Sequence, residues 1–200
     1  MKMLLYCTKT KWQLFRDIIT GKWLIDKIKN RNAVNGKIVV ECDYEVEKIK
    51  NKLTNDNSHL ELSTVKLTEK ELFEKSCLNR YEMFNYLQNN FTKKGESNGY
   101  AIHIKNLHIY DEPKELSDFY KDNETFKYIK ELWENYGLPD KDDYDDVIIK
   151  KAPQNMMYAY DKDSPNEYAL ISIRPEWLCK ILNGEKTVEV RKKVLREMLK

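Results

Sequence analysis

The chain has 200 residues, a length typical of one domain, and its 35 Lys and Arg residues nearly balance its 33 Asp and Glu residues. The formal net charge of +2 argues against nucleic-acid binding through bulk charge, but it leaves a local basic groove open. No apolar run approaches the length of a membrane-spanning helix and no secretory segment opens the chain, so we expect a cytoplasmic protein without a membrane partner.

The four cysteines show neither paired spacing nor nearby histidines: Cys7, Cys42, Cys77 and Cys179. A zinc site needs clustered ligands, and the chain has only 3 histidines. We therefore expect reduced and mostly buried thiols, no metal site and no cofactor.

The first part of the chain predicts two strands separated by a basic stretch. Residues 3–8 and 35–49 are rich in apolar and β-branched residues, as buried or half-buried strands are. Between them, residues 9–35 are basic and irregular with a helix-like piece at 12–21, and their cations form either a solvated face or one wall of a groove. Residues 50–60 are polar and turn-like.

The middle of the chain is predicted to alternate helices with strands. These elements are two helical segments within 68–91, a strand from 100 to 110 with a turn at 111–113, an amphipathic helix at 125–137 ending before Gly137 as its C′ residue, a solvated acidic loop at 140–146, and a strand at 147–160 interrupted near Pro153.

The last part of the chain predicts a strand, a capped helix and a charged strand. Residues 167–173 are apolar and β-prone, and Pro175 suits the first turn of a helix because its missing amide hydrogen would have no partner there. Gly184 suits the left-handed position that ends this helix. The helix should have one apolar face, formed by Trp177, Leu178, Ile181 and Leu182.

Three charged residues follow within one turn and strand. On a strand, Glu189 and Arg191 share one face while Val188 and Val190 point to the core, and Lys186 stands at the entrance. An Arg fork, a Lys point charge and a Glu acceptor could hold a nucleobase edge or a phosphate. On spacing alone, however, a surface ion pair of little energetic value is the better interpretation.

The whole closing segment, "SIRPEWLCKILNGEKTVEVRK", closely resembles the opening of ASCH domains, which belong to the PUA-like superfamily. The ASCH signature is a strand, a helix after Pro, and G-x-K-x-x-E-x-R, which corresponds here to Gly184, Lys186, Glu189 and Arg191. Further blocks resemble later parts of the same family: "LLYCTK", "GKIVVECDYEV", "YAIHIKNLHIYDEPKELSDF" and "APQNMMY". In the last block, Asn155 and Met156 stand where Ser and Trp are usual.

The resemblance implies an α+β fold, namely a PUA-like small β-barrel with surrounding helices, formed as a single domain by residues 1–200. The usual first block is here the last, so we predict a circular permutation in which residues 159–167 link the family's usual C- and N-termini. The alternative is a fragment of a tandem array whose last segment pairs with a neighbouring chain, as a homodimer or strand-swapped oligomer. Permutation is preferred because one complete set of blocks is present and none is duplicated.

The resemblance also implies binding of RNA or of a modified nucleoside or nucleotide in a cleft beside the signature, with single-stranded or flipped bases as targets. The residues expected at this cleft come from the signature, the neighbouring strand and two aromatic candidates for stacking: Lys186, Thr187, Glu189, Arg191, Tyr6, Thr8, Lys9, Trp177 and Tyr158. For Trp177, packing in the core is the preferred interpretation.

Two other functions stay open. The chain could be a hydrolase, either an amidohydrolase on an acylated nucleoside or a ribonuclease, with Lys186 as base or nucleophile and Glu189 as proton relay. Some small ASCH members hydrolyse an acetylated cytidine, but they have a threonine where this chain has Glu189. Burial and Arg191 would lower the lysine pKa and Glu189 would raise it, and the sequence leaves the balance open. The third alternative is a phage or mobile-element interaction protein without a ligand.

Overall fold

The computed structural model describes residues 2–9, 34–53, 60–87, 99–121, 123–136, 147–162 and 166–199. The chain divides into two compact units, each built from two separate stretches. The first unit comprises Met1–Cys42 and His108–Leu178, and the second comprises Asp43–Leu107 and Cys179–Lys200. The predicted helix-like piece at 12–21, the predicted cap Gly137 and the acidic loop at 140–146 lie outside the described residues.

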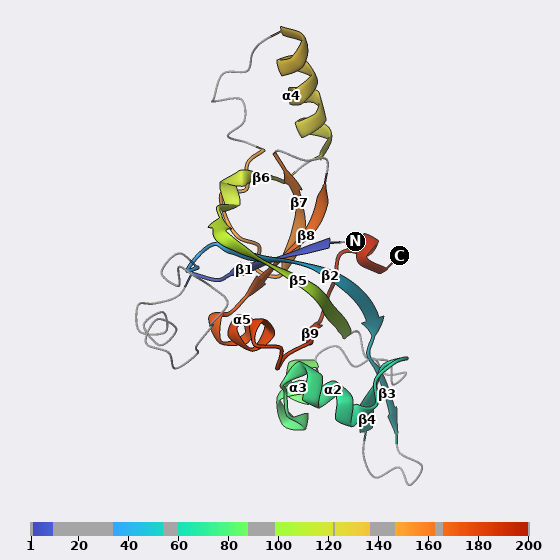
Figure 1. Cartoon of the computed structure of the whole chain (residues 1–200). Coiled ribbons are helices and arrows are strands. Elements are labelled where there is room, and N and C mark those ends of the chain that lie inside the picture. Colours follow the sequence, from blue (N-terminus) through green and yellow to red (C-terminus); the bar gives the residue numbers. More distant parts are fainter. Residues whose placement is uncertain are drawn as a thin grey trace. The chain divides into compact units, whose positions relative to one another are not determined.

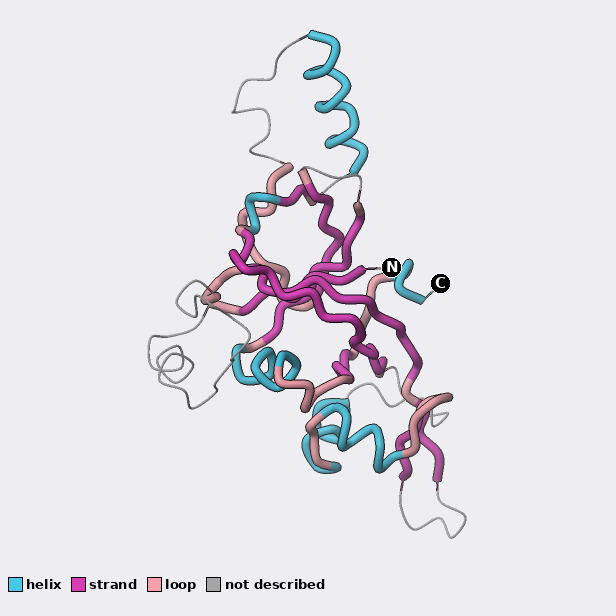
Figure 2. Tube along the Cα trace, viewed as in Figure 1, coloured by secondary structure: helices cyan, strands magenta, loops and turns pink. Residues whose placement is uncertain are grey.

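Strands dominate the described part of the chain (Figures 1 and 2). The strands are β1 Lys2–Cys7, β2 Ile38–Lys48, β3 Lys50–Leu53, β4 Leu60–Ser63, β5 Tyr100–Lys114, β6 Phe119–Tyr120, β7 Met156–Asp161, β8 Glu167–Ile173 and β9 Val188–Arg191. The helices are α2 Glu69–Ser76, α3 Arg80–Leu87, α4 Asn123–Tyr136 and α5 Pro175–Leu182, with 3-10 turns η3 Leu116–Asp118 and η5 Arg196–Leu199.

Seven strands form a mostly antiparallel sheet in the order β6-β7-β8-β1-β2-β5-β9. The fold is therefore α+β as expected, but within the described residues the sheet is open, so the predicted closed β-barrel is wrong. Closure requires the first and last strands of the order to pair along their lengths. Here those strands are β6, which has 2 residues, and β9, which has 4, so they offer little backbone for a closing ladder.

The first unit contains the most buried pair of strands, β1 and β8. They pair in parallel from Lys2 opposite Tyr168 to Cys7 opposite Ile173, and every residue of β1 after Lys2 is buried. Parallel strands that are covered on both faces need near-continuous apolar runs, as both sequences have. The predicted strands at 3–8 and 167–173 are thus confirmed, and β8, although late in the sequence, lies beside β1.

The segment 159–167, predicted as a linker, includes paired strand at both ends. β7 runs to Asp161 and β8 begins at Glu167, and the two strands pair antiparallel with Tyr160 opposite Glu167. Residues 163–165 lie outside the described part. That this segment joins the usual termini of the family stays a prediction.

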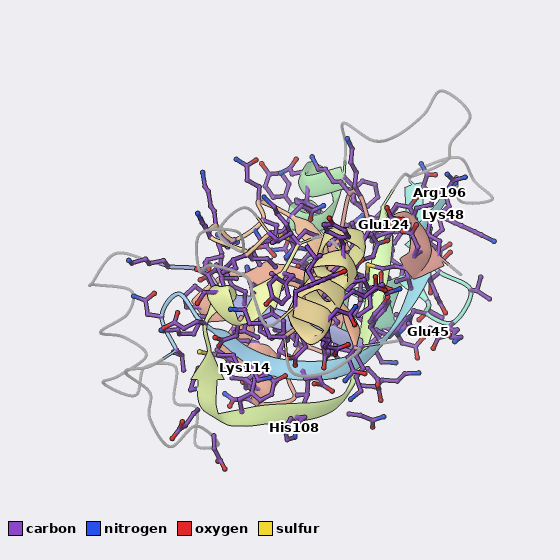
Figure 3. All side chains as sticks on the ribbon, turned by 90° about the horizontal axis from the view of Figure 1, so that it is seen from above. Glu45, Lys48, His108, Lys114, Glu124 and Arg196 are labelled. Atoms are coloured by element: carbon purple, nitrogen blue, oxygen red, sulfur yellow. The ribbon has the colours of Figure 1, made fainter. Side chains whose placement is uncertain are left out.

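One block of the family resemblance, "YDEPKELSDF", surrounds a lysine in the first unit. The Lys114 ammonium lies 5.1 Å from the centroid of the Tyr110 ring and 5.4 Å from that of Phe119, and 3.3 Å from Asp161 Oδ2. Figure 3 shows Lys114 and His108 along the same strand, β5. The two rings and the carboxylate offset the cost of a half-buried cation, so this block has a packing role.

The second unit has its own apolar core beneath α2 and α3. It combines residues of β4, β5, β9 and both helices with one residue between β2 and β3 and one before α2: Ile49, Leu62, Leu67, Leu72, Met83, Leu87, Ala101, Val188 and Val190. Both helical segments predicted within 68–91 are present, and α2 has the capping box in which Thr68 and Glu71 exchange hydrogen bonds.

Two segments that were predicted as turns contain strand. The turn expected at 111–113 is strand, because β5 continues to Lys114. Pro113 lies beyond the part of β5 that pairs with β9, so its missing amide breaks no bond of that ladder. The polar stretch 50–60 begins and ends in strand, because β3 and β4 pair as two antiparallel strands around residues 54–59, which lie outside the described part.

Helix α5 spans Pro175–Leu182, and Gly184 stands after it in the predicted left-handed position, with a φ of +79°. The Gly184 amide donates to the Ile181 carbonyl at 3.0 Å and the Glu185 amide donates to the Lys180 carbonyl at 2.9 Å. This pair of bonds is a Schellman motif, which satisfies carbonyls that the helix leaves without partners. It also sets the direction in which the chain enters β9.

Replacing Gly184 should therefore measure the cost of left-handed backbone strain without a steric clash. A Cβ added at Gly184 meets no described atom within 4 Å, so Gly184→Ala adds left-handed strain without a clash. We expect Gly184→Ala to lower the free energy of unfolding by about 1 kcal/mol in chemical denaturation. Gly184→Asn should cost less, because Asn tolerates this conformation; equal losses in the two variants would contradict this account.

Candidate functional site

Lys186 stands at the centre of the candidate site in the second unit. The turn after α5 delivers it: its amide donates to the Lys180 carbonyl at 3.0 Å, directly after the Schellman bonds. The residue is 3% exposed, although lysine is among the residues least often buried. Such burial requires partners for the ammonium group.

Two acceptors meet the Lys186 ammonium. Nζ donates to the carbonyl oxygen of Ser76 at 2.6 Å and lies 3.3 Å from Glu189 Oε2. Ser76 is the last residue of α2, so the ammonium binds one of the carbonyls that a helix C-terminus leaves open and lies at the negative end of the helix dipole. The sequence offers no signal for this contact because the acceptor is a main-chain atom.

Further bonds join the same turn to the end of α2. The Thr187 amide donates to the Lys75 carbonyl at 2.9 Å, and the Cys77 thiol donates to the Glu185 carbonyl at 3.3 Å. The turn at 185–187 thus caps α2. The side chain of Thr187, a predicted ligand residue, is exposed, while its carbonyl accepts from the Ile104 amide at 2.9 Å.

Strand β9 positions the two other charges. Glu189 and Arg191 share one face as predicted, with Arg191 Nε 2.9 Å from Glu189 Oε1, and Val188 and Val190 pack in the apolar core. Each of the two charged side chains is 12% exposed. The interpretation as a solvated surface pair is therefore wrong: the structure brings Lys186, Glu189 and Arg191 together as a buried ionic cluster.

Burial decides the balance of effects on Lys186 that the sequence left open. Removal from water lowers the pKa of its ammonium below the ordinary 10.5, Arg191 adds to this lowering, and Glu189 opposes it. A lowered lysine pKa makes the neutral amine more accessible near neutral pH. The cluster thus has formally two cations and one carboxylate.

The other predicted site residues belong to the first unit. The Tyr6 hydroxyl and the Lys9 side chain lie together against Gly36, each 3.6 Å from where a Cβ at that glycine would stand. Burial raises the pKa of the Tyr6 hydroxyl. The Thr8 amide donates to the carbonyl of Ile173 at 2.9 Å.

The two predicted stacking residues are both half-buried in the first unit. Tyr158 lies on β7 opposite Ala169, and Trp177 lies on α5 with the Arg174 guanidinium 5.9 Å from its ring centroid. Leu178, Ile181 and Leu182, by contrast, are buried. Trp177 is thus only partly a core residue.

A second polar pair in the second unit was not anticipated. His103 Nε2 lies 3.7 Å from Glu47 Oε2, and burial lowers the pKa of His103 while Glu47 opposes the change. Glu47 also accepts from the Lys66 amide at 3.2 Å. Glu45, labelled in Figure 3, pairs with Lys105 at 3.0 Å and also with Lys66.

The described residues contain no group of three or more His, Cys, Asp or Glu side chains that could hold a metal ion. No helix among them is both long and apolar enough to cross a membrane.

The chain matches no protein-family model, no curated protein and no solved structure. The similarity to ASCH domains therefore rests on the residues and blocks of the sequence.

Replacing Lys186 by methionine should remove a buried charge and two polar contacts. Because Ser76 and Glu189 lose their donor, we expect Lys186→Met to lower the free energy of unfolding by about 2 kcal/mol at neutral pH. The folded-state pKa of Lys186 lies below 10.5, so the unfolded chain holds the proton more tightly. Wild-type stability should therefore rise relative to the variant as pH increases from the lowered pKa to about 10.5. Denaturation across this range, with exposed Lys193→Met as control, measures the effect; a pH-independent difference would contradict it.

Replacing His103 should alter acid sensitivity. Its folded-state pKa lies below the ordinary 6.5, so the unfolded chain binds the proton more readily and stability falls as pH drops from about 6.5 through the lowered pKa. We expect His103→Gln to lose less stability than wild type over this window in urea denaturation. His108→Gln, on the exposed part of β5, should follow the wild-type profile. The prediction fails if His103→Gln has the acid profile of wild type.

Proposed function

We propose that the protein binds RNA or a modified nucleoside or nucleotide through the cluster of Lys186, Glu189 and Arg191. The observation that carries this proposal is the placement of buried Lys186 and mostly buried Arg191 around a single carboxylate, on a turn and an adjacent strand. The PUA-like fold and the permuted order of its blocks are part of the same proposal.

The energetics of burial support a ligand role. Ions removed from water are costly, and the attraction within a pair often only offsets that cost. Here Glu189 contacts both cations, at 3.3 Å and 2.9 Å, so these three residues together carry a formal charge of +1. A phosphate or an electron-rich base edge complements such a charge, and the planar Arg191 fork suits both.

The order of local elements also supports the proposal. β8, α5, the Gly184 turn and β9 occur in the order of the ASCH signature, and the strand of the "LLYCTK" block pairs with β8. The resemblance to ASCH domains implies nucleic-acid ligands at this segment. The geometry supplies donors and an acceptor at the same residues.

A second candidate function, hydrolysis of an acylated nucleoside or of RNA, is favoured by one observation. A lysine acts as a base or nucleophile only when neutral, and burial lowers the pKa of Lys186 toward that state. Glu189 Oε2 lies 3.3 Å from Nζ, within range to exchange a proton as a relay. The Glu189 position, where related hydrolases have threonine, is the departure that weakens this candidate.

One experiment separates the two functions. The immobilised protein is incubated with a nuclease digest of total tRNA, and both retained compounds and new products are followed by mass spectrometry. We expect specific retention without turnover, reduced about tenfold or more by Arg191→Lys, which keeps the charge but loses the bidentate fork. Lys193→Ala, which removes an exposed cation close in sequence, is the matched control and should retain as wild type does.

Two other results of this experiment would contradict binding without turnover. A deacylated or cleaved product that is absent with Lys186→Met would support the hydrolase. Neither retention nor product with wild-type protein would overturn both candidates and leave an interaction protein without a ligand at this cluster.

A further inference from the structure

The strand beside β9 brings an aromatic residue to the charged face. In the antiparallel pairing of β5 with β9, Tyr100 is directly opposite Arg191, and Ile102 is directly opposite Glu189. Directly opposite residues project from the same face of a sheet, with Cβ atoms about 4.5–5.5 Å apart. Tyr100 therefore lies on the face that holds Glu189 and Arg191.

Exposure distinguishes the two β5 residues on this face. Ile102 is fully buried, whereas Tyr100 is partly exposed at the start of the strand. The carboxylate of Glu189 is thus opposite a buried aliphatic side chain. The guanidinium of Arg191 is opposite the partly exposed Tyr100, which lies in the same unit as Lys186.

We infer that the ligand is a nucleotide rather than a neutral nucleoside, with its base stacked on Tyr100 and its phosphate bound at Arg191. This inference rests on the proposed function and narrows it to one chemical class. A flat ring offers a stacking surface for any base, and the adjacent guanidinium offers paired donors that fit phosphate oxygens. A phosphate is also attracted by the two neighbouring cations, Lys186 and Arg191, whereas an uncharged group is not.

Tyr100 is a stacking residue that was not expected from the sequence, in addition to the expected Trp177 and Tyr158. It shares one strand-pair row with Arg191. Tyr100 begins the "YAIHIKNLHIYDEPKELSDF" block, where nothing but its aromatic type marks it. Only the register between β5 and β9 connects it to Arg191.

The phosphate requirement is tested with wild-type protein and a matched pair of ligand mixtures. A ribonuclease digest of total tRNA, which consists of nucleotides, is divided and one half is treated with phosphatase. Retention on the immobilised protein is compared by mass spectrometry. We expect a retained nucleotide to bind at least about tenfold better than its dephosphorylated counterpart. Equal retention from the two halves would overturn the inference while leaving nucleoside binding intact.

The stacking role is tested by substitution of Tyr100. Tyr100→Leu keeps apolar bulk but removes the ring, so we expect about a tenfold loss of nucleotide retention. Tyr100→Phe keeps the ring and should lose less than about threefold, and Tyr81→Leu, at an exposed tyrosine of α3, serves as the unchanged control. Thermal unfolding verifies that each variant is folded.

The outcomes separate this inference from the function on which it rests. Undiminished retention by folded Tyr100→Leu would overturn the stacking role. An unfolded Tyr100→Leu leaves the phosphatase comparison, which needs no variant, to decide the ligand class. No retention from either half by wild type would overturn the proposed binding function itself.

Discussion

The bond from the Lys186 ammonium to the Ser76 carbonyl joins the parts of the second unit on which the candidate site depends. Through this bond and the adjacent Thr187 amide, the turn after α5 closes the C-terminus of α2. The same ammonium contacts Glu189 on β9, which in turn contacts Arg191. A helix end, a turn and a strand are therefore fixed by one buried cation, which would be costly without these acceptors.

This arrangement gives the G-x-K-x-x-E-x-R pattern a structural meaning for each position. Gly184 supplies the left-handed residue that follows α5, and Lys186 caps the C-terminus of α2. Glu189 contacts both cations, so removal of either cation takes away one of these two ionic contacts. A pattern of this kind can hold the local fold and bind a ligand with the same side chains, because a preorganised cluster needs little rearrangement to meet an anion.

The first unit shows how another block of the resemblance acts through packing. Tyr110 and Phe119 flank the Lys114 ammonium, and Asp161 on β7 pairs with it. Tyr110 also donates to Glu41 at 3.1 Å, and burial beside that carboxylate raises the pKa of the tyrosine hydroxyl strongly. Residues from β2, β5 and β7 thus share a polar network next to the apolar core of this unit, which favours one register among these strands.

The sequence by itself determined the local elements whose signals are short-range. Apolar runs predicted β1 and β8, and Pro175 with Gly184 predicted both ends of α5, because these features depend on a residue and its near neighbours. Period-two alternation placed Glu189 and Arg191 on one face. The tertiary structure alone decided that Glu189 is buried, that a main-chain carbonyl of α2 receives Lys186, and that Tyr100 lies opposite Arg191. It also decided that the sheet is open within the described residues. These features depend on strand register and on contacts between residues far apart in the chain, which composition and spacing do not specify.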